Sequence, residues 1–270
     1  MPKKIVYMLL ILTAITGALL LYSFFIEPNM LSITEVNLYF KNLPAEENGL
    51  KIVQISDLHY NKDAQIYEKT LRKIKKLNPD LIVITGDFIG SNKNTEVINY
   101  CKQIVKLGKP VYAILGNWDH NLYELTKFEE GLRSSGIHLL VNSNEKLSKN
   151  FFIAGTDDSF SGHADLEKTF SGIPENAFVI LLTHSPDIIY DAVKYKPELV
   201  LCGHTHGGQV KIPFTKKALY VPSVYGSRFL EGLFHIDGTY MYVNRGIGNS
   251  HLRMRFMSIP EITVFTLHRK

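Results

Sequence analysis

Five short clusters of metal-binding side chains lie along this sequence, and each follows a run of apolar residues. In chain order they are Asp57-Leu58-His59, Gly86-Asp87, Gly116-Asn117-Trp118-Asp119-His120, Thr183-His184 and Gly203-His204-Thr205-His206. Carboxylate, amide oxygen and imidazole are ligands that suit borderline divalent metals such as Mn, Fe or Zn, and no thiolate is needed. The sequence therefore predicts one assembled metal site.

The number of ligands favours two ions. Asp87 has two carboxylate oxygens and can offer one to each ion. Paired metals about 3.5–4 Å apart clamp the attacking and leaving oxygens of a phosphoryl displacement, while a shared water becomes hydroxide near neutral pH. We therefore expect a phosphoesterase that uses two divalent ions, with Asp87 among its catalytic residues.

Strand-like and helical patterns alternate after Gly49 and place these clusters. Strands are expected at Leu50–Ser56, Leu81–Thr85, Val111–Leu115, Phe151–Ala154, Phe178–Thr183 and Leu199–Cys202, and helices at Ile66–Leu77, Thr95–Leu107, Leu125–Ser134 and Asp187–Tyr195. In open α/β sheets, ligands bind beyond the carboxyl ends of the strands. Asp57, Asp87, Asn117, His184 and His204 each come shortly after an expected strand, so we expect them at one edge of a sheet. Gly86, Gly116 and Gly203 precede ligands and permit sharp turns and close backbone approach.

The remaining pattern predicts a second sheet. Shorter strands rich in Gly and aromatic residues are expected at Gln209–Ile212, Gly232–Ile236, Tyr240–Val243 and Ile262–Leu267, and Ser32–Phe40 suits a sheet edge. Unbroken apolar runs such as Leu81-Ile82-Val83-Ile84 indicate strands buried on both faces. The fold class expected is α/β: two mixed β-sheets packed together and flanked by helices, in four layers.

Composition is that of a folded protein and limits the partners. The chain has 270 residues, 45% hydrophobic and 21% charged, with a net charge of +4. This mild charge, without a basic stripe, gives no reason to expect a nucleic-acid partner. Cys202 lies in the apolar run Leu199-Val200-Leu201-Cys202, which favours a buried free thiol over a disulfide with Cys101.

The N-terminus predicts a transmembrane anchor. Ile5–Ile26 carries no charged residue, and as a helix it would be ~33 Å long, enough to cross a bilayer core. Lys3 and Lys4 precede it, which favours a cytoplasmic N-terminus and an extracytoplasmic domain. A cleaved signal peptide is the rival, disfavoured by the length of the run and by the lack of a convincing cleavage site. A buried core helix fits poorly because no polar face interrupts the run. The expected division is an anchor at 1–26, a linker with an edge strand at 27–49 and a catalytic domain at 50–270.

The motifs Asp-x-His, Gly-Asp, Gly-Asn-x-Asp, His and Gly-His-x-His resemble the calcineurin-like metallophosphoesterase superfamily from Leu50 to about Leu267. Gly203–Gln209, Arg245–Gly248 and Pro260–Thr263 resemble a membrane-associated bacterial subgroup. This subgroup contains phosphodiesterases and a branch that hydrolyses UDP-diacylglucosamine, so a phosphate-containing small molecule or lipid is the implied substrate. The resemblance implies two divalent ions, with manganese preferred. One would be held by Asp57, His59, Asp87 and His206, and the other by Asp87, Asn117, His184 and His204.

One position departs from the superfamily pattern. Many members have His directly after the Asn, where it protonates the leaving group or holds the phosphate, but this chain has Trp118, its only tryptophan. The proton donor is therefore open between His120 and a water. A leaving group of low pKa needs less protonation, which favours a pyrophosphate or phosphodiester substrate.

Other polar residues near these motifs have weaker claims. Arg245 could bind substrate phosphate bidentately, and a structural ion pair is the alternative. Asp119 is expected to orient a ligand. Asp157 and Asp158 either rim the cleft or, as the preferred account, occupy an exposed turn, and His163 and His251 are expected at the surface.

Two classes of function remain open at this level. The first is a membrane-anchored phosphohydrolase in which Asn117 and the histidines position the phosphoryl group. The second is a binding scaffold that keeps the fold and has lost catalysis, for which Trp118 is the single favourable feature. A lipid-linked UDP-sugar would explain both anchor and metals, but such lipids are made in the cytoplasm while Lys3 and Lys4 favour the opposite side, so both sides of the membrane remain open.

Overall fold

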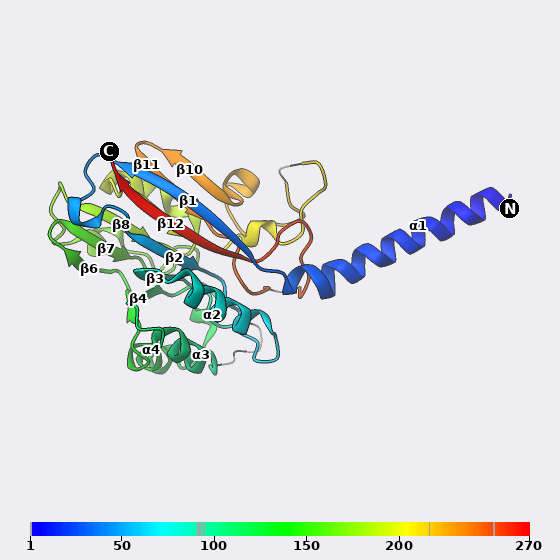
Figure 1. Cartoon of the computed structure of the whole chain (residues 1–270), viewed down its shortest axis with the longest axis horizontal. Helices are drawn as coiled ribbons and strands as arrows, with labels where there is room; N and C mark the ends of the chain where they lie inside the picture. Colours follow the sequence, from blue (N-terminus) through cyan, green and yellow to red (C-terminus); the bar gives the residue numbers. More distant parts are fainter. Residues whose placement is uncertain (1, 91–92, 94, 216, 251) are drawn as a thin grey trace.

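The computed structural model describes residues 2–270, apart from 91–92, 94, 216 and 251. Two six-stranded sheets lie face to face, with strand orders β1-β12-β2-β3-β4-β5 and β10-β11-β9-β8-β7-β6 (Figure 1). The first contains β1 (Ser32–Phe40), β2 (Lys51–Ile55), β3 (Leu81–Thr85), β4 (Val111–Ile114), β5 (His138–Leu139) and β12 (Glu261–Arg269). The second contains β6 (Ser143–Ser148), β7 (Phe151–Gly155), β8 (Phe178–Leu182), β9 (Leu199–Cys202), β10 (Gly232–Ile236) and β11 (Thr239–Val243).

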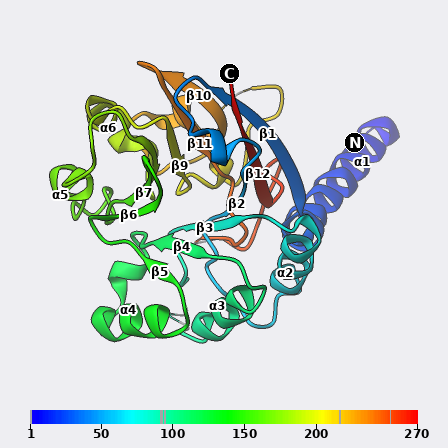
Figure 2. The same ribbon diagram turned by 60° about the vertical axis from the view of Figure 1, so that its left-hand side comes forward.

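Helices cover the outer face of each sheet (Figure 2). Those on the first sheet are α2 (Ile66–Leu77), α3 (Val97–Val105) and α4 (Leu125–Ser134), and those on the second are α5 (Leu166–Phe170) and α6 (Ile189–Ala192). Because successive strand residues point to opposite faces, Ile82 packs under α2–α4 while Val83 packs between the sheets. All five residues of β3 are buried. The predicted four-layer α/β architecture is confirmed.

Both sheets are mixed, as predicted. Strands β2, β3, β4 and β5 are mutually parallel, and β12 runs antiparallel to β2. In the second sheet β7, β8, β9 and β11 are parallel, and the edge strands β6 and β10 are antiparallel to their neighbours. The Gln54 side chain donates to Thr85 Oγ1 and to the Cys202 carbonyl, both at 3.0 Å, and so joins the two sheets next to their carboxyl ends.

Several predicted elements differ from the structure. Gln209–Ile212 is not a strand, because its pairing is limited to isolated bridges at Val210 and Lys211. The predicted helix Asp187–Tyr195 is a short α-helix between two 3-10 turns. Strand β6 was missed because its sequence, Ser-Asn-Glu-Lys-Leu-Ser, is polar and forms an edge with a register shift. Cys101 and Cys202 are buried free thiols, which confirms the prediction for Cys202.

The apolar N-terminal segment is a single helix that extends away from the domain (Figure 1). Helix α1 spans Lys3–Leu21 and none of its residues is buried, which rules out the core-helix alternative. The helical region Lys3–Asn29 is long and apolar enough to cross a membrane, with a mean hydropathy of 2.3 in its most apolar window. Length and composition are equally compatible with a signal sequence, so that alternative stays open.

The end of this helical region is fastened to the domain. A π-helical turn, Tyr22–Ile26, leads into the 3-10 turn Glu27–Asn29, and Ser23 and Glu27 are both buried. The Ser23 carbonyl accepts from the Arg255 backbone N–H at 2.9 Å, and the Glu27 carboxylate accepts from the Met257 N–H at 3.0 Å. The following strand β1 pairs in parallel with β12 along its whole length. It has no other neighbour in the strand order and is an edge strand of the first sheet.

Candidate metal centre

The predicted ligands lie in loops at the carboxyl ends of the strands of both sheets. Asp57 and His59 follow β2, Asp87 follows β3, Asn117 follows β4, His184 follows β8, and His204 and His206 follow β9. Backbone hydrogen bonds connect neighbouring loops: Asp57 N–H donates to the Gly86 carbonyl at 3.1 Å and Gly203 N–H to the His184 carbonyl at 2.9 Å. Loops far apart in the sequence are thus held beside one another.

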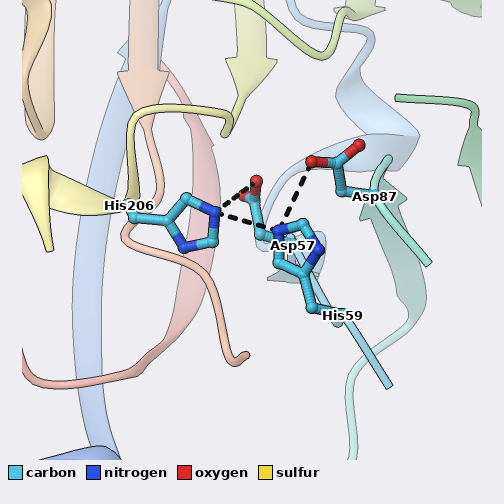
Figure 3. A group of neighbouring side chains, drawn as sticks. All are labelled: Asp57, His59, Asp87 and His206. Carbon is cyan, nitrogen blue, oxygen red and sulfur yellow. Dashed lines mark hydrogen bonds and ion pairs between the residues drawn. The ribbon is translucent and has the colours of Figure 1, made fainter. Parts of the chain in front are cut away.

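Four of these side chains form one compact group (Figure 3). Asp57, His59, Asp87 and His206 are all buried, and one ligand atom from each lies within 4.8 Å of the others. His59 Nε2 lies 3.4 Å from Asp87 Oδ2 and 3.0 Å from His206 Nε2, and His206 Nε2 lies 3.4 Å from Asp57 Oδ1. These are the four residues that the resemblance implied for one ion.

The other side chains adjoin this group through Asp87. His184 Nε2 lies 3.3 Å from Asp87 Oδ2 and 3.2 Å from Asn117 Oδ1. His204 Nδ1 lies 3.2 Å from His184 Nε2, and His204 Nε2 is buried without a hydrogen-bond partner. Asp87 Oδ2 therefore faces both groups of ligands.

The histidine hydrogen bonds show that the cluster fits cations. His59 Nδ1 lies 3.0 Å from the Ile89 carbonyl and His184 Nδ1 lies 2.8 Å from the Thr85 carbonyl. A carbonyl only accepts, so each Nδ1 carries a hydrogen and each Nε2 faces Asp87 Oδ2. Lone pairs of nitrogen facing carboxylate oxygen repel unless a positive charge lies between them. The donor set, all oxygen and imidazole nitrogen, suits a pair of divalent ions.

The electrostatics of the buried groups agree with this. Burial raises the pKa of Asp87, but the charge of His184 and its hydrogen bond lower it to about 2. Burial lowers the pKa of His184, but the charges of Asp87 and then Asp57 raise it well above the usual histidine value. Burial, followed by the charge of His184, lowers the pKa of His204 to about 4. The site thus combines an ionised Asp87 with a neutral His204, the forms that bind metal, whereas the raised pKa of His184 keeps a proton beside Asp87 that a bound ion would displace.

Backbone strain is concentrated at the predicted ligands. Asp57, His59, Asp87, His204 and His206 all have positive φ, between 40° and 70°. This left-handed conformation is unfavourable for residues other than glycine, by roughly 1–2 kcal/mol each. Such strain persists where surrounding contacts impose it, and it gathers at functional sites. No sequence pattern indicated it.

Two of the predicted glycines allow the loops to approach. A Cβ on Gly203 would overlap Ser56 Oγ and Asp57 Oδ2, and a Cβ on Gly116 would overlap the backbone and side chain of Asp87. At Gly203 the atoms in the way end two side chains that are buried and hydrogen-bonded, and at Gly116 they include the backbone nitrogen of Asp87. Close packing of the β2, β3, β4 and β9 loops therefore requires glycine at both positions.

Trp118 packs against the cluster. Its ring meets the His59 ring edge to face, with centroids 5.4 Å apart. Its backbone N–H donates to Asp87 Oδ1 at 2.8 Å, so Oδ1 is held by the backbone while Oδ2 faces the histidines.

Asp119 organises the same loops: it accepts from the Gly116 N–H at 2.9 Å and the Ile89 N–H at 3.1 Å. Asp119 was expected to orient a ligand side chain, and in the structure it orients the backbone of the two loops instead.

His120 belongs to a neighbouring cluster. Its Nε2 lies 2.7 Å from Asp157 Oδ1, and its ring stacks on exposed His163 with centroids 4.2 Å apart. Burial lowers the pKa of His120, but Asp157 raises it above the usual histidine value. The prediction that Asp157 and Asp158 occupy an exposed turn is wrong, because both are buried. Their loop folds inward, with the centroid of the Phe160 ring 4.6 Å from that of the His204 ring. The other histidine expected at the surface, His251, lies outside the described residues.

Arg245 lies in an ion-pair network. Its Nε lies 3.2 Å from Glu261 Oε2 and 4.0 Å from Glu231 Oε2, and its Nη2 donates to Ser32 Oγ at 3.0 Å. Arg245 therefore makes the structural ion pair that was the alternative to phosphate binding. It is not among the residues that line the cavity described below. The sequence favoured a solvated position for the neighbouring Arg255, and this expectation is wrong: Arg255 is fully buried and donates to the carbonyls of Gly246 and Ser258.

A cavity of about 210 Å³ opens onto the cluster. Asp87, Asn117, His204 and His206 line its base. Its other walls are mainly apolar: Trp118, Phe160, Val210, Leu219, Tyr220, Pro222 and Leu252, with Thr205, Gly208, Gln209 and Ser250 between them. The cavity could therefore receive a phosphate at its base and an apolar group at its mouth.

Several proteins are similar to this chain in sequence or in fold. The metallophosphoesterase YkuE of Bacillus subtilis is 34% identical over 258 residues, which cover 91% of this chain and 88% of its own. The UDP-2,3-diacylglucosamine pyrophosphatase LpxG of Chlamydia muridarum is 31% identical over 314 residues, with coverage of 94% and 95%. The crystal structure of a dimetal phosphatase from Danio rerio aligns at a TM-score of 0.51 and 11% identity, over 82% of this chain and 94% of that one, and shares the fold.

The family model of calcineurin-like phosphoesterases matches residues 50–208, which is more than half of the chain. The match contains every predicted metal ligand from Asp57 to His206. Together with the similarity over most of the chain to a metallophosphoesterase and a pyrophosphatase, it shows that this chain belongs to the calcineurin-like phosphoesterase family and is a hydrolase.

Proposed function

We propose that this hydrolase is anchored in a membrane and cleaves a phosphodiester or pyrophosphate bond with the help of two divalent ions. The observation that carries the proposal is the position of Asp87 Oδ2, which lies 3.4 Å from His59 Nε2 and 3.3 Å from His184 Nε2. A carboxylate placed between two groups of ligands is suited to serve both ions. The ions proposed are manganese, with iron or zinc as alternatives that the same donors accept.

The ligands are assigned from the two groups of side chains. Asp57, His59, Asp87 and His206 hold one ion, supported by the short distances among their ligand atoms. Asp87, Asn117, His184 and His204 hold the other, supported by the contacts of His184 with Asp87, Asn117 and His204.

The chain's own residues prepare the site for reaction. When bound, the ions would supply Lewis acidity to the phosphoryl oxygens and lower the pKa of the attacking water. The amide of Asn117 lines the cavity and positions the phosphoryl group, and the Trp118 ring packs edge to face against the His59 ring. The proposed proton donor to the leaving oxygen is His120, whose ring Asp157 orients and whose pKa it raises against the effect of burial, or a water, since His120 is outside the residues that line the cavity.

The substrate proposed is a phosphate-containing small molecule or lipid, such as a lipid-linked nucleotide of the UDP-diacylglucosamine type. Two observations support it. The relative from Chlamydia muridarum carries that substrate in its name, and apolar side chains surround the mouth of the cavity above its polar base. No nucleic-acid partner is proposed.

We place the anchor at residues 1–26, the edge-strand segment at 27–49 and the catalytic domain at 50–270. The exposed, apolar helix α1 supports the anchor. Lys3 and Lys4 before the helix favour a cytoplasmic N-terminus and an extracytoplasmic catalytic domain.

The test is hydrolysis of an aryl phosphodiester by the full chain in detergent with added manganese. Asp87→Asn should lower kcat at least ~100-fold, because a ligand of both ions would lose its charge. Asp191→Asn, which alters an exposed carboxylate paired with Lys194, should leave kcat unchanged. Full turnover by the Asp87 variant would refute the assignment.

A further inference from the structure

The end of the apolar helix fixes where a bilayer meets the domain. The apolar run continues through exposed Phe24, Phe25 and Ile26, and the next residue, Glu27, is already buried in the domain. No flexible spacer therefore separates the anchor from the catalytic domain. Whatever part of the domain surrounds Glu27 must lie at the membrane surface when α1 is in the membrane.

Two loops surround this point. The loop between β11 and β12 binds the anchor directly, through Arg255 N–H to Ser23 and Met257 N–H to Glu27. The loop between β9 and β10 is joined to it by two backbone hydrogen bonds, Lys211 N–H to Phe256 at 3.0 Å and Phe256 N–H to Gln209 at 2.9 Å. Both loops project from the end of the domain from which α1 emerges (Figure 1).

These loops expose large apolar side chains to an unusual degree. The helix-side surface, as we define it, consists of Ile212, Phe214, Leu219, Tyr220, Leu252 and Met257, all of them exposed. Phe214 is fully exposed and Leu219 is 73% exposed. Soluble surfaces carry scattered apolar residues, but a contiguous group marks a contact with a partner or a membrane. Exposed Lys217 and Arg253 on the same loops would suit anionic headgroups.

The helix-side surface is also the rim of the catalytic cavity. Leu219, Tyr220 and Leu252 line the cavity that ends at Asp87 and His206. Ser250 lines both this cavity and a second one whose wall includes Phe24 of the anchor and Pro28 just after it. The path from the metal cluster to solvent therefore leaves the protein beside the anchor.

We propose that the helix-side surface is a membrane-contact surface that enters the headgroup region of the bilayer, so that the catalytic cavity opens at the lipid surface. Amphipathic protein surfaces of this kind are buried about 5–10 Å into the boundary between headgroups and acyl chains. The continuity of the surface with the anchor favours lipid as the occupant over a second copy or another protein. The inference rests on the membrane attachment of α1 proposed above.

The test uses the full chain in phosphatidylcholine vesicles whose lipids carry a nitroxide near the top of the acyl chain. Single cysteines are introduced at Phe214 and Leu252 and labelled with a fluorophore, while the native Cys101 and Cys202 are buried. The matched control is a label at exposed Tyr39, roughly 23 Å along β1 from Ser32 at about 3.3 Å per residue. The far end of β1 lies opposite α1 (Figure 1). A label at Leu12 in α1 reports insertion of the anchor.

Stronger quenching by the nitroxide at positions 214 and 252 than at 39 would support the membrane-contact surface. Quenching at 12 together with equal, weak quenching at 214, 252 and 39 would overturn it while leaving the anchor intact. The absence of quenching at 12 would overturn the membrane attachment and this surface with it, without bearing on the metal site. Disulfide cross-linking between copies through a cysteine at 214, without quenching there, would assign the surface to a second copy and overturn the proposal.

Discussion

The Glu27 carboxylate, at the end of the apolar helix, accepts a hydrogen bond of 3.0 Å from the backbone N–H of Met257. The two residues are 230 positions apart in the sequence. Met257 follows Arg255, whose guanidinium donates to the Gly246 and Ser258 carbonyls and lies 3.5 Å from His206 Nδ1. The anchor and the metal cluster are therefore connected through the loop between β11 and β12.

This connection predicts which truncation the domain tolerates. A chain lacking residues 1–21 keeps Ser23 and Glu27, whereas a chain lacking 1–30 leaves the amides of Arg255, Met257 and Ser258 without their acceptors. Each lost hydrogen bond is worth about 0.5–1.5 kcal/mol net, and the packing of the removed segment is lost with them, so the shorter chain should melt at least ~5 °C lower. Thermal denaturation followed by circular dichroism measures the difference. In the full chain, Glu27→Ala should lower Tm while Glu35→Ala, at an exposed position of β1, should not; equal Tm values for these two variants would contradict the connection.

Metal content should separate the two proposed ion sites. The purified full chain, loaded with manganese, should hold two ions. Asp87→Asn should weaken both sites, His206→Ala should empty one, and His204→Ala should empty the other, because the Asp87 carboxylate lies beside His59 of one ligand group and His184 of the other. Metal analysis by mass spectrometry after gel filtration gives the stoichiometry. Asp191→Asn serves as the control, and a full complement of two ions in Asp87→Asn would be incompatible with a shared carboxylate.

Gly203→Ala should disrupt the site without changing any ligand. The new Cβ would overlap Ser56 Oγ and Asp57 Oδ2, and forced overpacking of this kind costs typically about 1–3 kcal/mol. We expect a lower free energy of unfolding in urea and reduced metal content. Gly90→Ala is the matched control, because a Cβ there would make an ordinary contact of 3.4 Å with His59 Cβ. Equal stability of the two variants would show that the close approach at Gly203 is not required.

The His120–Asp157 pair predicts a pH dependence of stability. The folded-state pKa of His120 is raised by Asp157, although burial opposes the shift. The stabilisation is therefore fully present below the unfolded pKa of about 6.5 and is lost as pH rises through the higher folded value. Urea unfolding should show a larger gap between wild type and His120→Gln at about pH 5.5 than at about pH 9. In a proton NMR titration, Asp157→Asn should lower the pKa of His120; an unchanged pKa would remove the pair as its cause.

The architecture was largely predictable from local patterns. The bounds of β1, β3, β9, β10, α2 and α4 agree with the predicted ranges, because apolar runs bounded by proline, glycine or charge define strands and helices locally. Two of the failures have a common cause. Strand β6 and the turn of Asp157 and Asp158 are polar in sequence. Pairing with β7 makes the first segment a strand, and the packing of the surrounding loops buries the second.

The sequence by itself determined the chemistry available to this protein. The ligand types and their places after strands depend on residue identity and on short-range periodicity, which a single chain displays. Tertiary structure decided how close the ligands come, which residues adopt a left-handed backbone, that Arg245 pairs with Glu261, and that the anchor is fastened at Glu27. These are contacts between segments up to 230 residues apart. They depend on the packing of two sheets and their loops, and no local pattern in the sequence records such long-range distances.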